Sequence, residues 1–260
     1  MEPIAKHQAL ILYEGPSLLD GRPIVVVGVV SGRNQKTGFM VQTYIQRADL
    51  DPRDANRTGE DVSICGTCPL RGVANLSKPT GLADHRGCYV QIGQGPLAVY
   101  RAYKRGRYQR ATSLEGITAL GAGKLVRVGT YGDGAAVPRY VWDALRREAK
   151  GHTAYSHQSE VAQSSFDPAM YMVSVNDVAA AQAAWASGAR TFRVVQDVSE
   201  IVRGQEILCP ASKEAGRRVK CSDCLLCGGA SVKAKSIAIP THGAGRKYAL
   251  RDTVTSGGMQ

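Results

Sequence analysis

Two apolar stretches near the start of the chain have the pattern of neighbouring β-strands. The segment RPIVVVGVVSG is rich in β-branched residues. In FMVQTYIQRADL, residues 40, 42, 44 and 46 alternate with residues 41, 43 and 45, so the two sets face opposite sides of a strand. The polar GRNQKTG lies between the two stretches. The pattern predicts an antiparallel hairpin with a longer loop.

Residues 124–195 have a different rhythm. Strands are predicted over 124–129, at HTAYSHQ, over 169–175 and at RTFRVV. One helix is predicted after Pro138, ending at Gly151, and a second over DVAAAQAAWASGA, capped by Asn176 or Asp177. Alternating strands and helices indicate parallel pairing with right-handed crossovers. We therefore expect an α/β fold: a partial or full TIM-type (β/α) barrel, with an N-terminal β-hairpin and a C-terminal cysteine-cluster segment. An open doubly wound sheet has the same rhythm.

In either fold, chemistry is expected at the carboxyl ends of the strands. Tyr131, Asp133 and His157 are placed there and are the catalytic candidates. Arg127 and Asn176 are the candidates for cofactor binding. The glycine-rich turn GTYGDGAAVP could admit an anion, or could be an ordinary turn in which Asp133 caps the next helix. It matches neither nucleotide-binding glycine motif.

The seven cysteines fall into two sets. An odd number weighs against a disulfide framework, and clustered thiols favour metal binding. The spacing C-x2-C-x2-C, preceded by a fourth cysteine, is typical of a metal or iron–sulfur site. The first set is Cys65, Cys68 and Cys88; the second set is Cys209, Cys221, Cys224 and Cys227.

Spacing leaves the identity of the metal open. Zinc could use the first set with His85, and four cysteines of the second set could hold another zinc. Alternatively, three thiolates could hold a 4Fe-4S cluster with one open iron, and the second set could hold a fully ligated cluster. A redox dithiol at Cys65 and Cys68 is a third interpretation.

The net charge of +11 and the pI of about 9.4 suggest a polyanionic partner. The stretch YRAYKRGRYQR interleaves tyrosines with cations, which suits contact with phosphates and bases. The alternative is an exposed helix with Tyr100 and Tyr103 packed inward. The candidate nucleic-acid contacts are Arg101, Tyr103, Lys104, Arg105 and Arg107.

The chain has 260 residues, 43% of them hydrophobic, which is enough for a sizeable core. We expect segments 1–110, 111–205 and 206–260 to form one compact unit. No apolar run is long enough to cross a membrane, and the first residues do not resemble a secretory signal. We therefore expect a cytoplasmic protein with reduced thiols.

Several stretches together resemble a cysteine-rich protein family borne by phages and prophages. They include SGRNQKTGFMVQTYI, SICGTCPLRG, GCYVQIGQGPLAVYRAYKRGRY, VRVGTYGDGAAVP, TAYSHQ, ARTFRVV and LCPASKEAGRRVKCSDCLLCGG, and they cover roughly residues 30–230. More remotely, their order is similar to that of phage radical-SAM-like barrels. The remote resemblance implies a cluster on Cys65, Cys68 and Cys88 near the mouth of a barrel. It departs from the C-x3-C-x2-C loop of radical-SAM enzymes.

Three functions follow as expectations. The first is an iron–sulfur enzyme of the host cytoplasm, with S-adenosylmethionine (SAM) as a possible cofactor, acting on a nucleotide or nucleic acid. The second is a zinc-stabilised, non-enzymatic nucleic-acid-binding protein. The third is a phage protein that binds a host protein.

Overall fold

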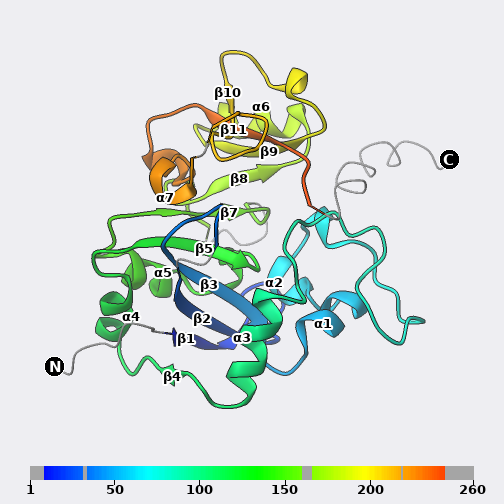
Figure 1. Cartoon of the computed structure of the whole chain (residues 1–260), viewed down its shortest axis with the longest axis vertical. Coiled ribbons are helices and arrows are strands. Elements are labelled where there is room, and N and C mark those ends of the chain that lie inside the picture. Colours follow the sequence, from blue (N-terminus) through cyan, green and yellow to red (C-terminus); the bar gives the residue numbers. More distant parts are fainter. Residues whose placement is uncertain (1–8, 32–33, 160–165, 218, 244–260) are drawn as a thin grey trace.

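The computed structural model describes residues 9–31, 34–159, 166–217 and 219–243, which form two sheets (Figure 1). The first sheet has six strands in the order β4-β1-β2-β3-β5-β6, and the second has five in the order β10-β11-β9-β8-β7. The strands are β1 Ala9–Pro16, β2 Pro23–Ser31, β3 Met40–Arg47, β4 Gln109–Arg110, β5 Leu125–Tyr131, β6 Gly151–Thr153, β7 Tyr155–Ser156, β8 Met172–Val175, β9 Thr191–Val195, β10 Glu206–Leu208 and β11 Ser236–Pro240.

The predicted hairpin is confirmed and forms the centre of the first sheet. Strands β2 and β3 pair antiparallel, with Val26 opposite Ile45 and Val27 opposite Tyr44. Strand β1, which was not predicted, pairs antiparallel with the other edge of β2. Residues 24–27 are fully buried, because both faces of this sheet are covered. An unbroken apolar run is what such a strand requires.

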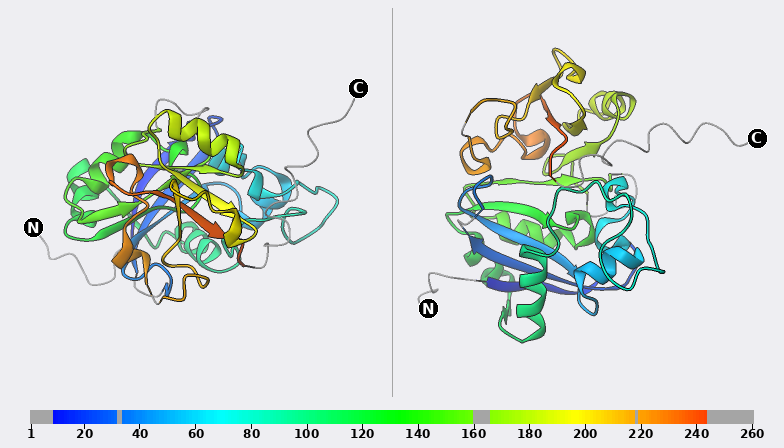
Figure 2. Two further views of the ribbon diagram at one scale, coloured as in Figure 1. Left: turned by 90° about the horizontal axis from the view of Figure 1, so that it is seen from above. Right: turned by 45° about the vertical axis from the view of Figure 1, so that its right-hand side comes forward.

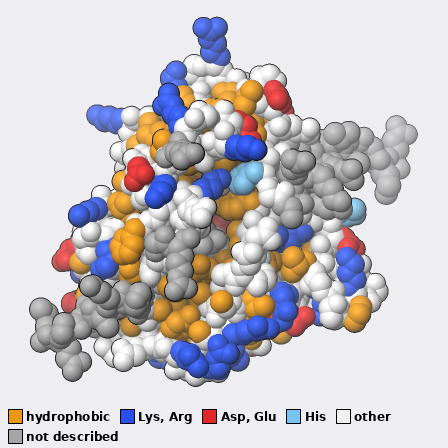
Figure 3. All heavy atoms as spheres, in the orientation of Figure 1, with side chains coloured by type: hydrophobic (Ala, Val, Ile, Leu, Met, Phe, Trp, Pro, Cys, Tyr) orange, Lys and Arg blue, Asp and Glu red, His pale blue; other side chains and the backbone are white. Residues whose placement is uncertain are grey.

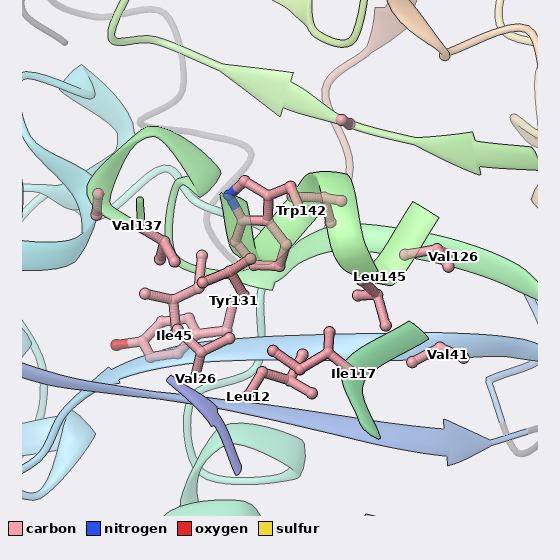
Figure 4. Close-up of a cluster of buried hydrophobic side chains, with 14 of the residues drawn as sticks. Leu12, Val26, Val41, Ile45, Ile117, Val126, Tyr131, Val137, Trp142 and Leu145 are labelled. Atoms are coloured by element: carbon pink, nitrogen blue, oxygen red, sulfur yellow. The ribbon is translucent and has the colours of Figure 1, made fainter. Parts of the chain in front are cut away.

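The largest hydrophobic cluster lies between the first sheet and the helices α4 (Leu114–Gly121) and α5 (Arg139–Arg146). Trp142 of α5 is fully buried there, above Tyr131 and Ile45 (Figure 4). Its indole Nε1 donates a hydrogen bond to the carbonyl of Gly134, at 2.8 Å. The indole therefore ties α5 to the turn that follows β5.

The short segment 151–156 belongs to both sheets. Its first half, β6, pairs parallel with β5, and its second half, β7, pairs parallel with β8. The prediction that Gly151 ends a helix is wrong: α5 ends at Arg146, and Gly151 begins β6 opposite Leu125. The amide of Lys150 already donates to the carbonyl of Lys124 at 2.9 Å. Hydrogen bonding to the β5 side of the sheet therefore begins before Gly151, and this segment is extended rather than helical.

The second sheet is entirely parallel and lies beside the first (Figure 2). Asp177 caps α6 (Val178–Ala186) through the amide of Ala180, as predicted. Inside the sheet, Arg193 and Glu206 form a buried ion pair at 2.6 Å. Among its described residues, the crossover from β10 to β11 contains only the four-residue α7 (Cys221–Cys224) and a short 3-10 turn, Gly229–Ser231.

The α/β class and the parallel pairing of the middle strands are confirmed. Strands pair across the expected segment boundaries, because β3 pairs with β5 and β9 pairs with β11. Across the described part of the chain, no helix combines the length and the apolar character needed to cross a bilayer.

Candidate metal and ligand cavities

The first set of cysteines meets the ends of the parallel strands around one cavity of about 120 Å³. Tyr131 and Asp133 at the end of β5, and His157 just after β7, line this cavity. The thiols come from the long crossover between β3 and β5, which also carries α1 (Pro52–Thr58), α2 (Val62–Cys65) and α3 (Gly95–Lys104). The predicted meeting of cysteines and strand ends is therefore present. The cavity-lining cysteines are Cys65, Cys68 and Cys88.

Backbone hydrogen bonds fix the loops that carry these thiols. The amide of Cys68 donates to the carbonyl of Cys65 at 3.1 Å, and the amide of Cys88 donates to the carbonyl of Leu70 at 2.9 Å. Gln158 Nε2 also donates to the carbonyl of Cys65, at 3.0 Å. Gly66 has a φ of 52° and lies against the Gln158 amide, so a side chain at position 66 would collide with it. A glycine is therefore required in this C-x-x-C turn.

Two arginines hold the same loops. Arg71 pairs with buried Asp61 at 2.6 Å and donates to the carbonyl of Gly66 at 2.8 Å. Arg86 donates to the carbonyls of Cys88 and Val90, both at 2.8 Å. Both arginines line the cavity, but so do Asp61 and Asp133, and Arg71 is neutralised by its pair with Asp61. Arg86 is therefore the cation that favours a negatively charged thiolate centre, next to Cys88.

Burial nevertheless keeps the free thiols protonated. It raises the pKa of Cys68 to about 12 and also raises the pKa of Cys65 and Cys88, while Arg86 opposes the shift at Cys88. At neutral pH these thiols are poor nucleophiles. A bound cation would reverse this, because metal ligation requires and stabilises the thiolate form. The shifts therefore weigh against a free redox dithiol.

The positions of the cysteine side chains bear on whether the first set could hold a single metal ion or a larger iron–sulfur cluster. Within the described ranges, no three or more His, Cys, Asp or Glu side chains are placed so that they could hold a metal ion. His85 is exposed and does not line the cavity, so it does not complete a zinc site there. An iron–sulfur cluster spreads its thiolates over several irons, so the ligands need not converge on one point. Three soft donors around a cavity suit such a group.

The hydroxyl of Tyr131 gives a second indication of a ligand. Tyr131 is 3% exposed, and its Oη is buried with no hydrogen-bond partner. Burial first, and then the nearby Cys65, raise its pKa well above the usual value. An unpaired buried hydroxyl costs free energy, about 1–3 kcal/mol in mutational data. A group bound in the cavity would relieve this cost.

Asp133 and His157 form a buried pair at the strand ends. The carboxylate of Asp133 accepts hydrogen bonds from the amides of Ala135, at 3.0 Å, and His157, at 2.9 Å. It thereby caps the 3-10 turn Gly134–Ala136, in line with the capping role considered for this turn. Burial raises the pKa of Asp133 and lowers that of His157. At Asp133 the two amide hydrogen bonds and the nearby His157 oppose this shift. Burial thus brings the pKa values of an acid and a base closer together, which suits proton exchange at this site.

The second set of cysteines has a different setting. Cys209 and Cys227 are buried in a hydrophobic cluster with Met172, Ile237 and Ile239. Burial raises the pKa of Cys227 to about 12, and the charges of the other three cysteines act in the same direction. The four cysteines therefore belong to one region, although no three of these described thiols converge as ligands of a single metal ion would. Cys221 is anchored by its amide, which donates to the carbonyl of Lys36 at 3.0 Å.

The two candidates for cofactor binding do not line the first cavity. Arg127 lies in the middle of β5 and lines a second cavity instead, together with Cys209 and Cys221. Asn176 follows β8; its Oδ1 is buried with no hydrogen-bond partner. Arg127 is displaced because Gly129, with a φ of 70°, interrupts the alternation of β5 between Arg127 and Tyr131.

The candidate nucleic-acid stretch forms α3 and the turn after it. Tyr100 is buried and Tyr103 is half-buried, with its hydroxyl donating to Glu14 at 3.0 Å, so the aromatic rings pack inward. Arg101, Lys104, Arg105 and Arg107 are exposed. Lys and Arg side chains gather along the lower edge of the molecule, over α3 (Figure 3). This surface offers charge without exposed stacking faces.

Sequence reasoning missed several residues of the two cavities. Arg71, Arg86 and Gln158 fix the cysteine loops, and Tyr89 and Tyr155 line both cavities. Arg86, Tyr89 and Gln158 lie within two residues of a cysteine or histidine that was singled out, which is a usable local signal. Tyr155 is a strand residue with no such signal.

No family model matches the chain, and no curated protein or solved structure shows significant similarity to it.

Proposed function

We propose that the chain is an iron–sulfur enzyme of the host-cell cytoplasm, with its catalytic cluster on Cys65, Cys68 and Cys88. One observation carries this proposal: three cysteines, two from one C-x-x-C turn and the third from a later loop, line a cavity that also holds the carboxyl ends of parallel strands. Three thiolates leave a cubane iron open for a ligand. Within this proposal, the parallel-paired strands β3, β5, β6, β7, β8, β9, β11 and β10 form part of a TIM-type barrel, and the cavity lies at its mouth.

The proposed roles follow from the surroundings of each side chain. A bound cluster would supply one-electron chemistry. Arg86 would offset its negative charge from a position that its backbone hydrogen bonds already fix, while Arg71, paired with Asp61, would hold the C-x-x-C turn. Asp133 would hold a proton on its carboxyl group, and the neutral imidazole of His157 would accept one. The hydroxyl of Tyr131 would donate a hydrogen bond to a group in the cavity.

The second set of cysteines is proposed to hold an auxiliary centre. Two of its four thiols are buried among apolar side chains, and none of the four lines the first cavity. The first cavity also has the acid–base pair, whereas the second set lies next to Lys36 and Arg127. A fully ligated centre in this position would support the fold or pass electrons, and it would bind no substrate on its metal.

The test is metal analysis of protein purified without oxygen. We expect iron and acid-labile sulfide in similar amounts, with a broad visible charge-transfer band. The combined variant C65S/C68S/C88S should lose only the first centre, and C209S/C221S/C224S/C227S only the second. Addition of SAM should perturb the electron paramagnetic resonance spectrum of the reduced wild type and of the second variant, but not that of the first.

Far-UV circular dichroism controls for folding, and the single variant C68S replaces the triple variant if the latter does not fold. Stoichiometric zinc with neither iron nor sulfide would overturn the proposal. A response to SAM that persists without the first set would assign the open iron elsewhere.

A second candidate is nucleic-acid binding by the exposed cations of α3 and the following turn. Arg101, Arg105 and Arg107 form no ion pair with any described residue. Such unpaired cations contact phosphates and make affinity depend on salt. Replacing all three with Gln should lower the slope of log affinity against log salt by about two to three units for duplex DNA. An unchanged slope would remove this surface from consideration.

A further inference from the structure

The second cavity is larger than the first and adjoins it. Its volume is about 300 Å³, and it lies between the loop before β3, the start of α3, β5 and the second set of cysteines. The two cavities share a wall formed by Tyr89, Val90, Thr130, Tyr155 and Phe192. A ligand in the second cavity would therefore lie next to the proposed catalytic centre.

A buried cation faces this cavity without a matching anion. Arg127 is 7% exposed. Its Nη2 donates to the hydroxyl of Tyr89 at 3.0 Å, and its guanidinium lies 5.4 Å from the centre of the Tyr155 ring. No described carboxylate forms an ion pair with it. Cys221 and Cys227 of the second set are acidic groups close enough to act on it, and as metal-bound thiolates they would balance part of its charge. With no carboxylate beside it, the side of Arg127 that faces the cavity still favours an anionic ligand.

Other groups on the wall of the cavity point to the same kind of ligand. The Nζ of Lys36 lies 3.1 Å from His242 Nε2, and both residues line the cavity. Glu214 lies near them but forms no ion pair with Lys36 in the described structure. Gly95 and Pro96 open the ten-residue α3 on the cavity wall, and no side chain caps this helix. The amides of Leu97 and Ala98 already donate to the carbonyls of Ile92 and Gln94, and Pro96 has no amide hydrogen, so the start of α3 adds partial positive charge rather than a row of free donors.

We propose that the second cavity binds the phosphate group of a small phosphorylated molecule. Arg127 would contact the phosphate from below, Lys36 from the rim, and the start of α3 from the side. Two full cations and a helix N-terminus suit a doubly charged phosphate better than a single carboxylate. The volume suits a small molecule rather than a nucleic-acid strand. As the substrate site of an iron–sulfur enzyme, this assignment rests on the proposed function; as a phosphate site, it stands on the cavity alone.

The deciding probe is inorganic phosphate, titrated at low ionic strength and followed by 31P NMR. We expect saturable binding that weakens about tenfold in Lys36→Gln, since a charge-assisted contact of this kind is lost. The matched control is Lys150→Gln, which changes the net charge equally at an exposed lysine that lines neither cavity. It should bind phosphate as the wild type does. Arg127→Gln should abolish binding, with folding checked by circular dichroism.

Two further ligands identify the source of the phosphate. If adenosine monophosphate binds more tightly than inorganic phosphate and adenosine does not bind, the ligand is a nucleotide. If the two phosphates bind equally, the ligand is another small phosphorylated molecule. Either result supports the site.

Absence of saturable binding, or equal weakening in Lys36→Gln and Lys150→Gln, would overturn the assignment. A different pair of results would also overturn it: no phosphate binding in the wild type, and loss of metal in Arg127→Gln. Arg127 would then serve to balance the charge of the second-set thiolates. Iron and sulfide content report separately on the proposed function: phosphate binding without iron would defeat that proposal alone.

Discussion

The two sheets reach stability by different means. The first sheet, with three antiparallel-paired strands at its centre, packs against a large apolar cluster around Trp142. The second sheet is all parallel, and the clusters on it are small. It contains instead a buried ion pair between Arg193 and Glu206, and two buried cysteines. One tryptophan packs against each sheet: Trp142 of α5 against the first, and Trp185 of α6 against the second. Their fluorescence can therefore report the unfolding of each sheet separately.

The contrast explains where the second set of cysteines lies. Parallel neighbours require a long crossover, which is usually a helix that covers one face of the sheet. The described residues of the crossover from β10 to β11 form no such helix; Cys221, Cys224 and Cys227 lie there in short turns. Cross-linking through a metal would replace the apolar face that a helix normally buries. The second sheet should therefore depend on its cysteines, and the first should not.

The largest effect is expected from Trp142→Ala. Removing the indole leaves a cavity and an unpaired carbonyl at Gly134, so the free energy of unfolding should fall by about 5 kcal/mol. Urea unfolding followed through Trp185 measures the consequence for the second sheet. Because segment 151–156 belongs to both sheets, the Trp185 transition should shift as well. A Trp185 transition that stays in place would show that the sheets unfold independently.

Glu206→Gln should lower the free energy of unfolding by about 4 kcal/mol, because it leaves Arg193 charged and unpaired in the interior. The matched control is Asp143→Asn, which breaks the exposed pair with Arg139 and should cost less than about 0.5 kcal/mol. Urea unfolding of both variants makes the comparison. Equal costs would mean that the ion pair in the second sheet contributes no more than a surface pair.

The junction between the sheets should make stability depend on pH. Burial, and secondarily Arg146, lower the pKa of His152 in β6 to about 4. The unfolded chain therefore binds a proton below pH 6.5 that the folded chain does not bind until about pH 4. Stability is present above pH 6.5 and should fall by up to about 3 kcal/mol as the pH decreases through this window.

His152→Gln removes this titration and can still donate a hydrogen bond to the Met170 carbonyl, the present partner of the ring at 3.0 Å. We expect a flatter dependence of unfolding free energy on pH, measured by urea titration at pH values from 4 to 7. His157 and His242 also have lowered pKa values and will leave a residual slope. A slope equal to that of the wild type would assign the effect to those two residues.

The smallest effect concerns single thiols in metal-free protein. Cys227→Ser places a hydroxyl in the apolar cluster and should cost about 2 kcal/mol. Cys224→Ser, at a half-buried position outside that cluster, should cost less than about 0.5 kcal/mol. With metal bound, both substitutions should be strongly destabilising, because each removes a ligand. Equal costs in metal-free protein would indicate that Cys227 does not pack as a hydrophobe.

The sequence pattern predicted elements whose periodicity or caps are local. The hairpin of β2 and β3 has strict alternation, and Asp177 caps α6 as expected. Strands β10 and β11 were missed because they are only three and five residues long and are defined by neighbours far along the chain. Gly151 was assigned to a helix end because pairing with Leu125 of β5 is invisible in the local sequence.

The residues of the candidate sites that have a local sequence signal were predicted, and those placed by distant pairing were not. Cysteine spacing identified all seven candidate ligands, and strand ends identified Tyr131, Asp133 and His157. Spacing did not reveal that the two sets lie on neighbouring cavities, since that depends on how the two sheets adjoin. Arg127 was associated with the wrong cavity because the positive φ of Gly129 breaks the two-residue repeat of β5.

Strand β11 lies between β9 and β10, although it is the last strand in the described part of the chain. During synthesis, the position of the central strand between β9 and β10 stays empty until residues 236–240 leave the ribosome. By then all seven cysteines have emerged, and β9 and β10 expose unpaired edges to other nascent chains. If the second set holds the proposed metal centre, metal binding competes with aggregation during this interval, and the supply of metal to the cell should then affect the yield of folded protein.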